Sequence, residues 1–343
     1  MKVLIAGGAG YIGSTVASAC LDAGITPIIV DNFLTGRKEF VRGRIFYEGD
    51  IADHELIDRV FRDHPDMYAS ILCAAVINVP DSVQKPVDYY RNNVSKSLRF
   101  VEGIVERGCD RLLFSSSASI YETNLVGPVD EHAPIEPLSP YAKTKAVSEW
   151  VFEDIARSGP LRVLSLRYFN PIGADPSMRS GLQLSEPTHV LGRMIQSMQT
   201  ESTFQITGTD YPTRDGSGIR DYVHVWDIAQ AHVLALENFD GLFTDGIPYE
   251  VINLGSGSGT TVKELLAAFN MVSGVPISVV EAPRREGDNA GSYASFEKAH
   301  RLLGWSPQLP LASGILDSLT WAKQRDQVLG GGTKDEARMV GRS

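Results

Sequence analysis

The N-terminal stretch of the chain holds the pattern that most constrains the fold. Residues 3–6 form a short apolar run, and four glycines follow it at once: Gly7, Gly8, Gly10 and Gly13. Apolar residues at helical spacing come next. Glycines in such an arrangement allow a tight turn, a close backbone approach to a phosphate and a helix N-terminus that faces the negative charge. The stretch therefore predicts a strand, a glycine turn and a helix.

The residues after this helix predict the ligand of the turn. A second apolar run at 26–30 ends in Asp31, about 20 residues after the glycines, where a dinucleotide site has the acid that binds its ribose. The order of strand, glycine turn, helix, strand and acid favours a bound dinucleotide over a simple strand-to-helix turn. Asp31 would repel a 2′-phosphate, so NAD is favoured over NADP, while Arg37 and Lys38 close by would attract one.

Further apolar runs alternate with helical patterns along the first half of the chain. The strand candidates are residues 45–48, 70–74, 111–115 and 162–166, and the helix candidates are 53–63, 87–107 and 140–157. This alternation is typical of a parallel sheet with helices on both faces, which binds ligands at the carboxyl ends of its strands. We therefore expect an α/β fold with a Rossmann-type, doubly wound parallel sheet.

The pattern changes after Asn170, where loops rich in Gly, Pro and Ser alternate with short helices. It predicts an NAD-binding domain over residues 1–170 and mainly a smaller, C-terminal substrate-binding lobe over 171–328. The apolar run at 251–254 predicts a strand that returns to the sheet, so that parts of 219–256 complete the first domain. Residues 329–343 are predicted to form a flexible tail.

A tyrosine and a lysine predict the chemistry. Tyr141 and Lys145 are four residues apart and lie on one helix face, after the run Ser115, Ser116 and Ser117. An ammonium beside a phenol lowers the tyrosine pKa from about 10 toward neutrality, and the resulting phenolate is a general base for a sugar hydroxyl. Such pairs are common on exposed helices, so this pair gains its meaning from the hydride acceptor predicted at the N-terminus.

Composition excludes several other functions. The net charge of −10 argues against a broad nucleic-acid surface. Residues 3–6 are too few to span a membrane and precede no signal-peptide cleavage pattern. Cys20, Cys73 and Cys109 lack CxxC or metal-site spacing and are predicted to be reduced core residues. We expect a cytoplasmic enzyme without a metal, nucleic-acid or membrane partner.

Family-like motifs extend along nearly the whole chain. They are Gly7-Gly-Ala-Gly-Tyr-Ile-Gly13, Asp31-Asn32, Glu48-Gly-Asp-Ile51, Ser82-Val-Gln-Lys-Pro86, Tyr90-Arg-Asn-Asn-Val94, Phe114-Ser-Ser-Ser-Ala118, Ser139-Pro-Tyr-Ala-Lys-Thr-Lys145, Arg167-Tyr-Phe-Asn-Pro171, Asp210-Tyr-Pro-Thr213, Arg220-Asp-Tyr-Val-His224 and Ala282-Pro-Arg-Arg-Glu-Gly-Asp288. Together they resemble the extended short-chain dehydrogenase/reductase superfamily, and within it the UDP-galactose 4-epimerase group. The last three are specific to sugar-nucleotide epimerases.

This resemblance implies an NAD-dependent isomerase that inverts C4 of a UDP-sugar through a transient 4-keto sugar. Ser117 would hydrogen-bond the sugar O4, Tyr141 would remove its proton and Lys145 would hold the nicotinamide ribose. The keto sugar would turn about its diphosphate link and take the hydride back on its other face. The UDP must then be gripped firmly, whereas the sugar must be held loosely.

The resemblance also implies the binding residues. Those for NAD are Gly7, Gly10, Tyr11, Ile12, Gly13, Asp31, Asn32, Asp50, Ile51, Ala74, Asn92, Lys145 and Tyr168. Those for the substrate are Ser117, Ser119, Tyr141, Asn170, Thr188, Arg193, Gln205, Thr207, Arg220, Arg285 and Asp288. The arginines suit a diphosphate because a guanidinium binds phosphate bidentately. The alternative for Arg220-Asp221 and Arg285-Glu286 is a pair of surface ion pairs.

One segment departs from the galactose epimerases. Residues 186–193 stand where those enzymes carry paired asparagines, and they bring His189 and Arg193 close to Arg179. Three cationic donors favour a sugar carboxylate, hence UDP-glucuronate and UDP-galacturonate. The segment resembles UDP-glucuronate 4-epimerases of actinobacterial antibiotic pathways. The alternative substrates are UDP-glucose and UDP-galactose.

Other functions on this scaffold can be weighed in the same way. Sugar-nucleotide 4,6-dehydratases and uronate decarboxylases carry acids where this chain has Ala118 and Ser119, so elimination and decarboxylation are disfavoured. An inactive NAD-binding sensor or scaffold would be expected to lose Tyr141 or Lys145, and both are present. Helices near 87–107 and 140–157 are candidates for the four-helix interface of a homodimer.

Overall fold

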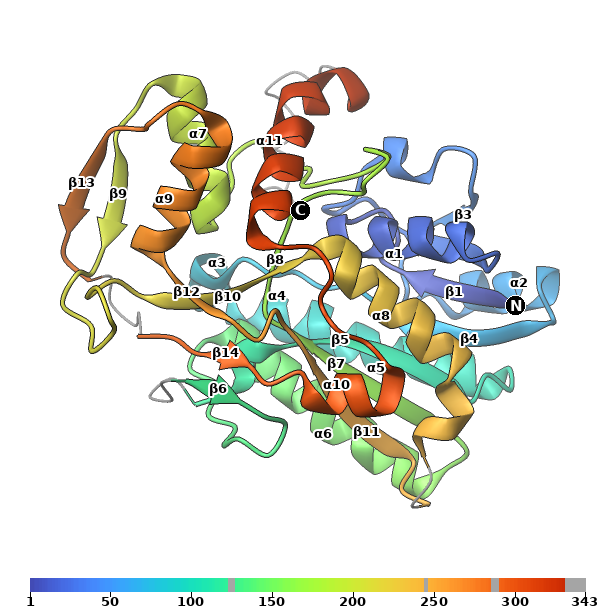
Figure 1. Ribbon diagram of the computed structural model, residues 1–343. Coiled ribbons are helices and arrows are strands. Elements are labelled where there is room, and N and C mark those ends of the chain that lie inside the picture. The colour runs from blue at the N-terminus through green and yellow to red at the C-terminus, as the bar shows by residue number, and fades with distance from the viewer. Residues whose placement is uncertain (123–126, 244–245, 285–289, 331–343) are drawn as a thin grey trace.

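The architecture is that of a large parallel sheet with a second, smaller lobe (Figure 1). The computed structural model describes residues 1–122, 127–243, 246–284 and 290–330. Seven strands form the main sheet: β1 (Lys2–Ala6), β2 (Thr26–Asp31), β3 (Ile45–Glu48), β4 (Met67–Leu72), β5 (Arg111–Ser117), β7 (Arg162–Tyr168) and β11 (Tyr249–Leu254).

All neighbouring strands of this sheet run parallel in the order β3-β2-β1-β4-β5-β7-β11. The chain therefore winds outward in both directions from β1 and β4, and the predicted doubly wound α/β fold is confirmed. The predicted runs of residues lie within two positions of these strands, except that β4 begins at Met67, three residues before the predicted run at 70–74. The apolar run at 251–254 does return to the sheet, as β11 beside β7.

Two layers of helices cover the sheet because its strands bury alternate residues on opposite faces. In β1, Val3 and Ile5 belong to one buried cluster, and Leu4 and Ala6 belong to the other. The first face is covered by α1 (Tyr11–Asp22), α8 (Val225–Glu237) and α10 (Glu297–Leu303). The second is covered by α2 (His54–Asp63), α5 (Lys96–Glu106) and α6 (Pro140–Ser158) (Figure 1).

The helix predicted over 87–107 is instead two α-helices joined by a π-helical turn. Its parts are α4 (Pro86–Tyr90), η2 (Arg91–Ser95) and α5, and α3 (Val79–Gln84) comes just before them. The turn places the buried Asn93 side chain on the Val76 backbone, where its amide accepts from the N–H and donates to the carbonyl, both at 2.9 Å. The sequence pattern did not reveal this interruption.

The smaller lobe has its own hydrophobic core. It contains the parallel pair β9 (Phe204–Thr207) and β13 (Val279–Ala282), the three-stranded sheet β12 (Gly259–Thr261), β10 (Ile219–His224) and β8 (Asn170–Ile172), and the helices α7 (Val190–Thr200), α9 (Val262–Ser273) and α11 (Leu311–Val328). Phe204, Phe269 and Ile315 are among the buried residues of this core. Thr261 and Glu264 form a capping box that starts α9.

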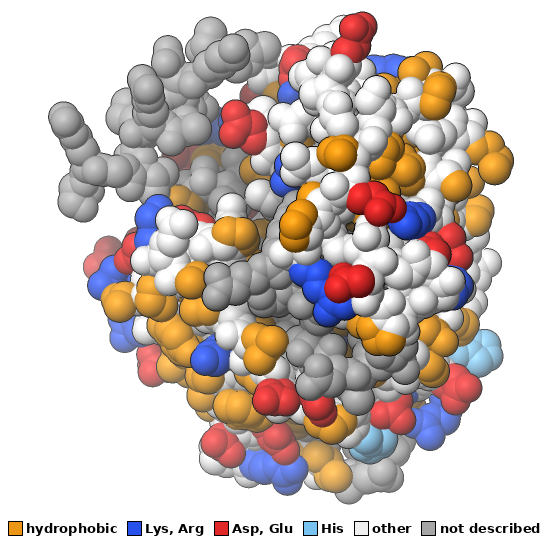
Figure 2. All heavy atoms as spheres, turned by 90° about the vertical axis from the view of Figure 1, so that its left-hand side faces the viewer, with side chains coloured by type: hydrophobic (Ala, Val, Ile, Leu, Met, Phe, Trp, Pro, Cys, Tyr) orange, Lys and Arg blue, Asp and Glu red, His pale blue; other side chains and the backbone are white. Residues whose placement is uncertain are grey.

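Short elements complete the described part of the chain. They are η1 (Lys38–Val41), η3 (Ala118–Ile120), β6 (Pro128–Val129), η4 (Phe239–Leu242) and β14 (Tyr293–Ala294). The face in Figure 2, on the side that carries β9 and β13, mixes acidic, basic and apolar side chains. Within the described ranges, no helix is both long and apolar enough to cross a bilayer. Of the predicted tail, residues 331–343 lie outside these ranges.

Candidate functional site

The glycine turn between β1 and α1 is shaped to admit a ligand at one position. Gly7 has a φ of +83°, and a Cβ there would meet the Ala74 nitrogen at 2.5 Å. A Cβ on Gly13 would meet the Gly7 oxygen at 2.3 Å. The packing of the protein itself thus requires both glycines. By contrast, the nearest atom to a Cβ on Gly10 is the Gly7 oxygen at 3.5 Å, so Gly10 leaves open space at the N-terminus of α1. This space fits the pyrophosphate of NAD.

The acid at the end of β2 is fixed in place. One Asp31 oxygen accepts from the Ala9 N–H at 2.9 Å and the other from the Phe33 N–H at 2.8 Å. Next to it, Asp50 pairs with Lys96 at 2.6 Å, a partner that sequence reasoning missed. Asn32 donates to Asp50 over 3.4 Å, and Ile51 is buried. Carboxylate and amide side chains at this strand end suit the hydroxyl groups of a dinucleotide ribose, so the residues present fit NAD.

Of the other predicted NAD residues, Ala74 borders the glycine turn, whereas the side chains of Tyr11 and Asn92 bind other parts of the protein. The Ala74 backbone borders Gly7, whereas the Tyr11 hydroxyl turns toward the smaller lobe and donates to the Gly173 carbonyl at 2.7 Å. Tyr11 and Ile12 can therefore offer an anion their backbone N–H groups at the start of α1. The Asn92 amide donates to the Asp88 carbonyl at 2.9 Å. A contact between Asn92 and NAD stays a prediction, while its neighbour Asn93 is the buried residue.

The predicted catalytic residues meet at the carboxyl end of β5. Ser117 is the last residue of that strand, and its hydroxyl interacts with Tyr141 and lies 2.9 Å from the Ser119 hydroxyl. Tyr141 and Lys145 lie on the first turns of α6, which begins with Pro140 after the capping residue Ser139. The Lys145 ammonium donates to the Ser115 carbonyl at 2.6 Å. Helix and strand thereby bring all three side chains together.

The pKa of Tyr141 moves against the prediction. Burial raises the pKa of this phenol above its ordinary value of 10, and the hydrogen bond with Ser117 lowers it only in part. The expected lowering of the Tyr141 pKa is wrong for this structure because the burial of the phenol outweighs the effects that lower it. Burial also lowers the pKa of Lys145 to about 8, although the nearby Cys73 and Glu149 oppose that shift.

Tyr168 lies one strand away from this group. Its hydroxyl is buried between the Ser115 hydroxyl at 2.9 Å and the His232 ring at 2.7 Å. Burial raises its pKa well above 10. Tyr168 is therefore a neutral side chain that hydrogen-bonds Ser115 of β5. A direct contact between Tyr168 and NAD stays a prediction.

The predicted diphosphate residues lie where β8 and β10 run side by side. The Asn170 amide donates to the Asp221 carbonyl at 3.0 Å. Arg220 precedes Asp221 on β10, and its guanidinium donates to the Ile219 carbonyl at 2.7 Å. Asp221 is fully buried, and its carboxylate accepts three backbone N–H groups, those of Ser256, Gly257 and Ala294. The surface ion pair considered for Arg220-Asp221 is therefore wrong.

Further substrate residues lie at the ends of β9 and β13. Gln205 is exposed on β9, and the half-buried Thr207 ends that strand in register with Ala282. Arg284 follows β13 and stacks over the Tyr211 ring at 4.1 Å. Arg285 and Asp288 lie outside the described residues, so their predicted contacts with the substrate remain predictions.

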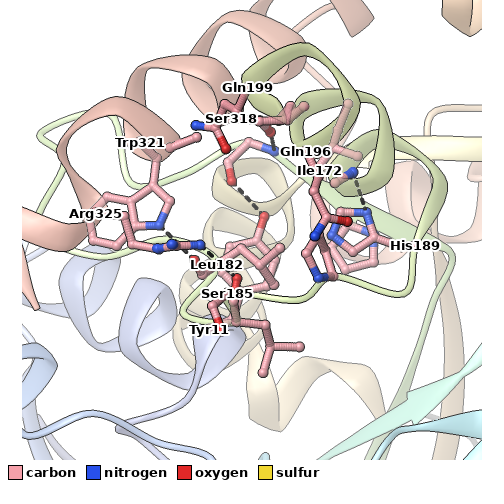
Figure 3. A pocket seen from close by; sticks show the side chains of 17 residues that line it. Tyr11, Ile172, Leu182, Ser185, His189, Gln196, Gln199, Ser318, Trp321 and Arg325 are labelled. Atoms are coloured by element: carbon pink, nitrogen blue, oxygen red, sulfur yellow. Dashed lines mark hydrogen bonds between the residues drawn. The ribbon is translucent and has the colours of Figure 1, made fainter. Parts of the chain in front are cut away.

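The segment before α7 is held by the last helix, α11. Trp321 donates to the Leu182 carbonyl at 2.8 Å, and Arg325 donates to the Leu184 carbonyl at 2.9 Å. A small pocket lies between this segment, α7 and α11, and Figure 3 shows Trp321 and Arg325 on one side of it and His189 on the other. The chain between β8 and α7 is thus fastened through its backbone.

Two of the three cations proposed for a sugar carboxylate are engaged elsewhere. Arg179 binds Asp22 at 2.7 Å and Asp175 at 2.6 Å. The Nδ1 atom of His189 accepts the Gly192 N–H at 3.2 Å and caps α7, a role that requires this nitrogen to be unprotonated. Arg193 and Thr188 are exposed. Asp175 is four residues from Arg179, but Asp22 is 157 positions away, a contact that no sequence pattern could show.

Comparison with known proteins gives results that agree with this geometry. The sequence model of the NAD dependent epimerase/dehydratase family matches residues 3–255. A UDP-glucose 4-epimerase of Azospirillum brasilense is 40% identical over 332 residues, which cover 96% of this chain and 94% of the relative.

Two solved structures show the same fold. The UDP-glucose-4-epimerase of Stenotrophomonas maltophila, with bound NAD and formylated UDP-arabinopyranose, has a TM-score of 0.90 at 34% identity, over 95% of this chain and 99% of that one. The enzyme of Bifidobacterium longum, in complex with NAD+ and UDP, has a TM-score of 0.86 at 32% identity, over 94% of this chain and 98% of that one.

Proposed function

The chain belongs to the NAD dependent epimerase/dehydratase family, and we propose that it interconverts UDP-glucose and UDP-galactose by inverting C4 of the sugar. The observation that carries the proposal is the meeting of Ser117, Tyr141 and Lys145 at the carboxyl end of β5, in the sheet whose glycine turn fits NAD. The UDP-glucose 4-epimerases named above are similar over nearly the whole chain, which supports this reaction over others on the same fold.

The mechanism follows from the chemistry of these side chains. NAD, when bound, supplies the acceptor and later the donor of a hydride at the sugar C4. Tyr141 acts as the base that takes the O4 proton and then returns it to the inverted sugar. Ser117, placed between Tyr141 and Ser119, orients O4. Lys145, fixed by the Ser115 carbonyl, would hold the nicotinamide ribose.

The substrate must turn between the two halves of the reaction. Asn170 and Arg220, on adjacent strands of the smaller lobe, are the described residues that would hold the diphosphate. Ala118 and Ser119 offer no second acid, which disfavours elimination and decarboxylation. Tyr141 and Lys145 both take part in the site, which disfavours an inactive NAD-binding sensor.

UDP-glucuronate is the less favoured substrate. Because Arg179 and His189 are engaged elsewhere, the uronate hypothesis rests on Arg193 alone, an exposed residue near the start of α7. The relatives described above are UDP-glucose 4-epimerases. If Arg193 does hold a sugar carboxylate, Arg193→Ala will raise the KM for UDP-glucuronate and leave that for UDP-glucose unchanged.

The test is an assay of the purified protein on UDP-glucose and UDP-glucuronate in parallel, with proton NMR to follow the C4 epimers. We expect UDP-galactose to form, and Tyr141→Phe to lower kcat by at least about 100-fold because the general base is lost. Tyr47→Phe is the control, since the Tyr47 hydroxyl contacts Asp63 at 2.8 Å, away from the site. An active Tyr141→Phe variant, or turnover of neither sugar with NAD added, would contradict the proposal.

We further infer that two copies associate through the apolar face of α3, α4 and α6. Both α3 and α4 pack against α6, and Val83, Val87 and Trp150 on this face are 63%, 65% and 50% exposed. Large apolar side chains gathered on one face favour contact with another surface. The mass in solution tests this inference: a dimer is expected, and Val87→Asp should give a monomer. Met271→Asp, on the 81% exposed Met271 of α9, should leave the dimer intact.

A further inference from the structure

A buried ion pair lies behind the catalytic residues and has no part in the proposed chemistry. Glu149 on α6 and Arg167 on β7 are 2% and 3% exposed. The guanidinium Nη2 donates to one carboxylate oxygen of Glu149 at 2.6 Å, and Nε donates to the other at 3.0 Å. The Ser116 hydroxyl makes a short hydrogen bond to the same carboxylate. Strand β5, strand β7 and helix α6 thus meet at one side chain.

Ser116 and Arg167, the two partners of Glu149, belong to a row of side chains across the sheet. Ser116, Arg167 and Asn253 are in register on the neighbouring strands β5, β7 and β11. The Tyr121 hydroxyl links the last two, because it accepts from Arg167 at 2.8 Å and donates to Asn253 at 2.7 Å. The row lies one residue before Ser117, so its geometry is that of the strand end where the catalytic serine stands.

Glu149 is also in line with the catalytic side chains on α6. Tyr141, Lys145 and Glu149 are spaced four residues apart, which places them on one face of the helix. Glu149 is therefore one turn beyond Lys145, and its negative charge favours the charged form of that lysine. The Glu149 carboxylate accepts from Ser116 on the strand that carries Ser117, and its backbone belongs to the helix that carries Tyr141.

The energetics of a buried ion pair favour a geometric role for Glu149 and Arg167 over a stabilising one. Removing two charges from water costs several kcal/mol each, so a buried pair often stabilises a fold no better than apolar side chains of the same size. What such a pair does provide is a fixed geometry, because its bidentate hydrogen bonds tolerate little displacement. A helix held this way cannot slide or rotate against the strand beside it.

We propose that Glu149, held by Ser116 and Arg167, is a positioning residue that sets the register of α6 against β5 and so places Tyr141 and Lys145 next to Ser117. This inference rests on the proposed function. A displacement of about 1 Å between a base and its substrate can cost on the order of 100-fold in rate, so the effect should be visible in kcat.

The test combines three substitutions with full pH–rate profiles of the purified NAD-loaded protein. Glu149→Gln removes the charge and should lower kcat about 10- to 100-fold with KM changed less than about twofold. It should also move the alkaline limb of the profile, where Lys145 loses its proton, to lower pH, because the charge that favours protonated Lys145 is gone. Glu149→Asp keeps the charge but shortens the side chain, so kcat should stay low while the limb returns to its original pH. Glu153→Gln on the same helix is the control, since Glu153 pairs with Arg157 at the surface.

The outcomes separate this inference from the proposed function. If Glu149→Gln lowers only the melting temperature and keeps the kcat and pH profile of the unchanged protein, Glu149 is merely structural and the inference is wrong. If Tyr141→Phe is fully active, the proposed function itself fails. Should Glu149→Gln not fold, Ser116→Ala removes just the hydroxyl contact, and a kcat equal to that of the unchanged protein would refute the positioning role.

Discussion

The glycine turn after β1 leads to a prediction for two substitutions. Gly13→Ala should lower the stability of the fold, whereas Gly10→Ala should weaken NAD binding. In Gly13→Ala the new methyl group would overlap the Gly7 oxygen at 2.3 Å and the Gly8 Cα at 2.9 Å, both backbone atoms. Such overpacking costs about 1–3 kcal/mol of folding free energy. In Gly10→Ala the nearest atom is at 3.5 Å, and the φ of −81° suits alanine, so the fold should lose less than about 1 kcal/mol.

The same methyl group on Gly10 occupies the space left for the pyrophosphate. If the steric cost of about 1–3 kcal/mol falls on the ligand instead, NAD binds roughly 5- to 150-fold more weakly. NAD at 100 times its Kd stabilises the fold by about 2.7 kcal/mol, and a 100-fold weaker site at the same concentration leaves about 0.4 kcal/mol. Urea unfolding of each variant with and without NAD measures both quantities.

Gly159→Ala serves as the matched control, because its Cβ would also meet a carbonyl oxygen at 3.5 Å, that of Ile155 at the end of α6. It should keep both the stability and the NAD effect. The reasoning is refuted if Gly10→Ala binds NAD as tightly as the unchanged protein, or if Gly10→Ala and Gly13→Ala lose equal stability without NAD.

Three further predictions concern single residues. Because burial lowers the pKa of Lys145 to about 8, kcat/KM should fall as the pH rises through about 8. Lys145→Arg should move this fall to higher pH. A fall that stays at the same pH would contradict its assignment to Lys145. Burial lowers the pKa of His232 to about 4 in the folded chain. Below about pH 6.5 the unfolded chain therefore takes up a proton that the folded chain does not. The free energy of unfolding should fall as the pH drops from about 6.5 toward 4. The loss should be about 2 kcal/mol between pH 7 and pH 5 in urea titrations, and smaller in His232→Gln. Thr261→Ala removes the capping box of α9 and should cost about 1 kcal/mol in the same titrations, whereas an unchanged midpoint would show that the cap contributes nothing.

The sequence predicted the main sheet well because a parallel sheet buries both faces of its strands. Runs such as residues 3–6 and 26–30 are then apolar throughout, and their order along the chain implies the doubly wound fold. The serine, tyrosine and lysine of the site were also found, since one strand end and one helix face place them together. The spacing of residues along one element carried this information.

The errors concern contacts between distant parts of the chain. Arg179 looked like a substrate ligand, but its partner Asp22 lies on α1. His189 is the local exception, because its ring caps α7 by accepting from the Gly192 N–H three residues on. Asp221 is buried among the backbone N–H groups of three later residues. The pKa of Tyr141 depends on how deeply the phenol is enclosed. Pairing and burial of this kind arise from tertiary packing, which single-sequence patterns do not encode.

The position of β11 at the edge of the main sheet has a consequence for synthesis of the chain. Strand β7 ends at Tyr168, but its partner β11 begins at Tyr249, with four elements of the smaller lobe between them: β8, α7, β9 and β10. At a ribosomal rate of roughly 5–20 residues per second, β7 waits about 4–16 s with one edge unpaired. An open edge of a growing sheet can pair with other chains. The unpaired edge of β7 therefore exposes the nascent protein to aggregation between the emergence of β7 and that of β11.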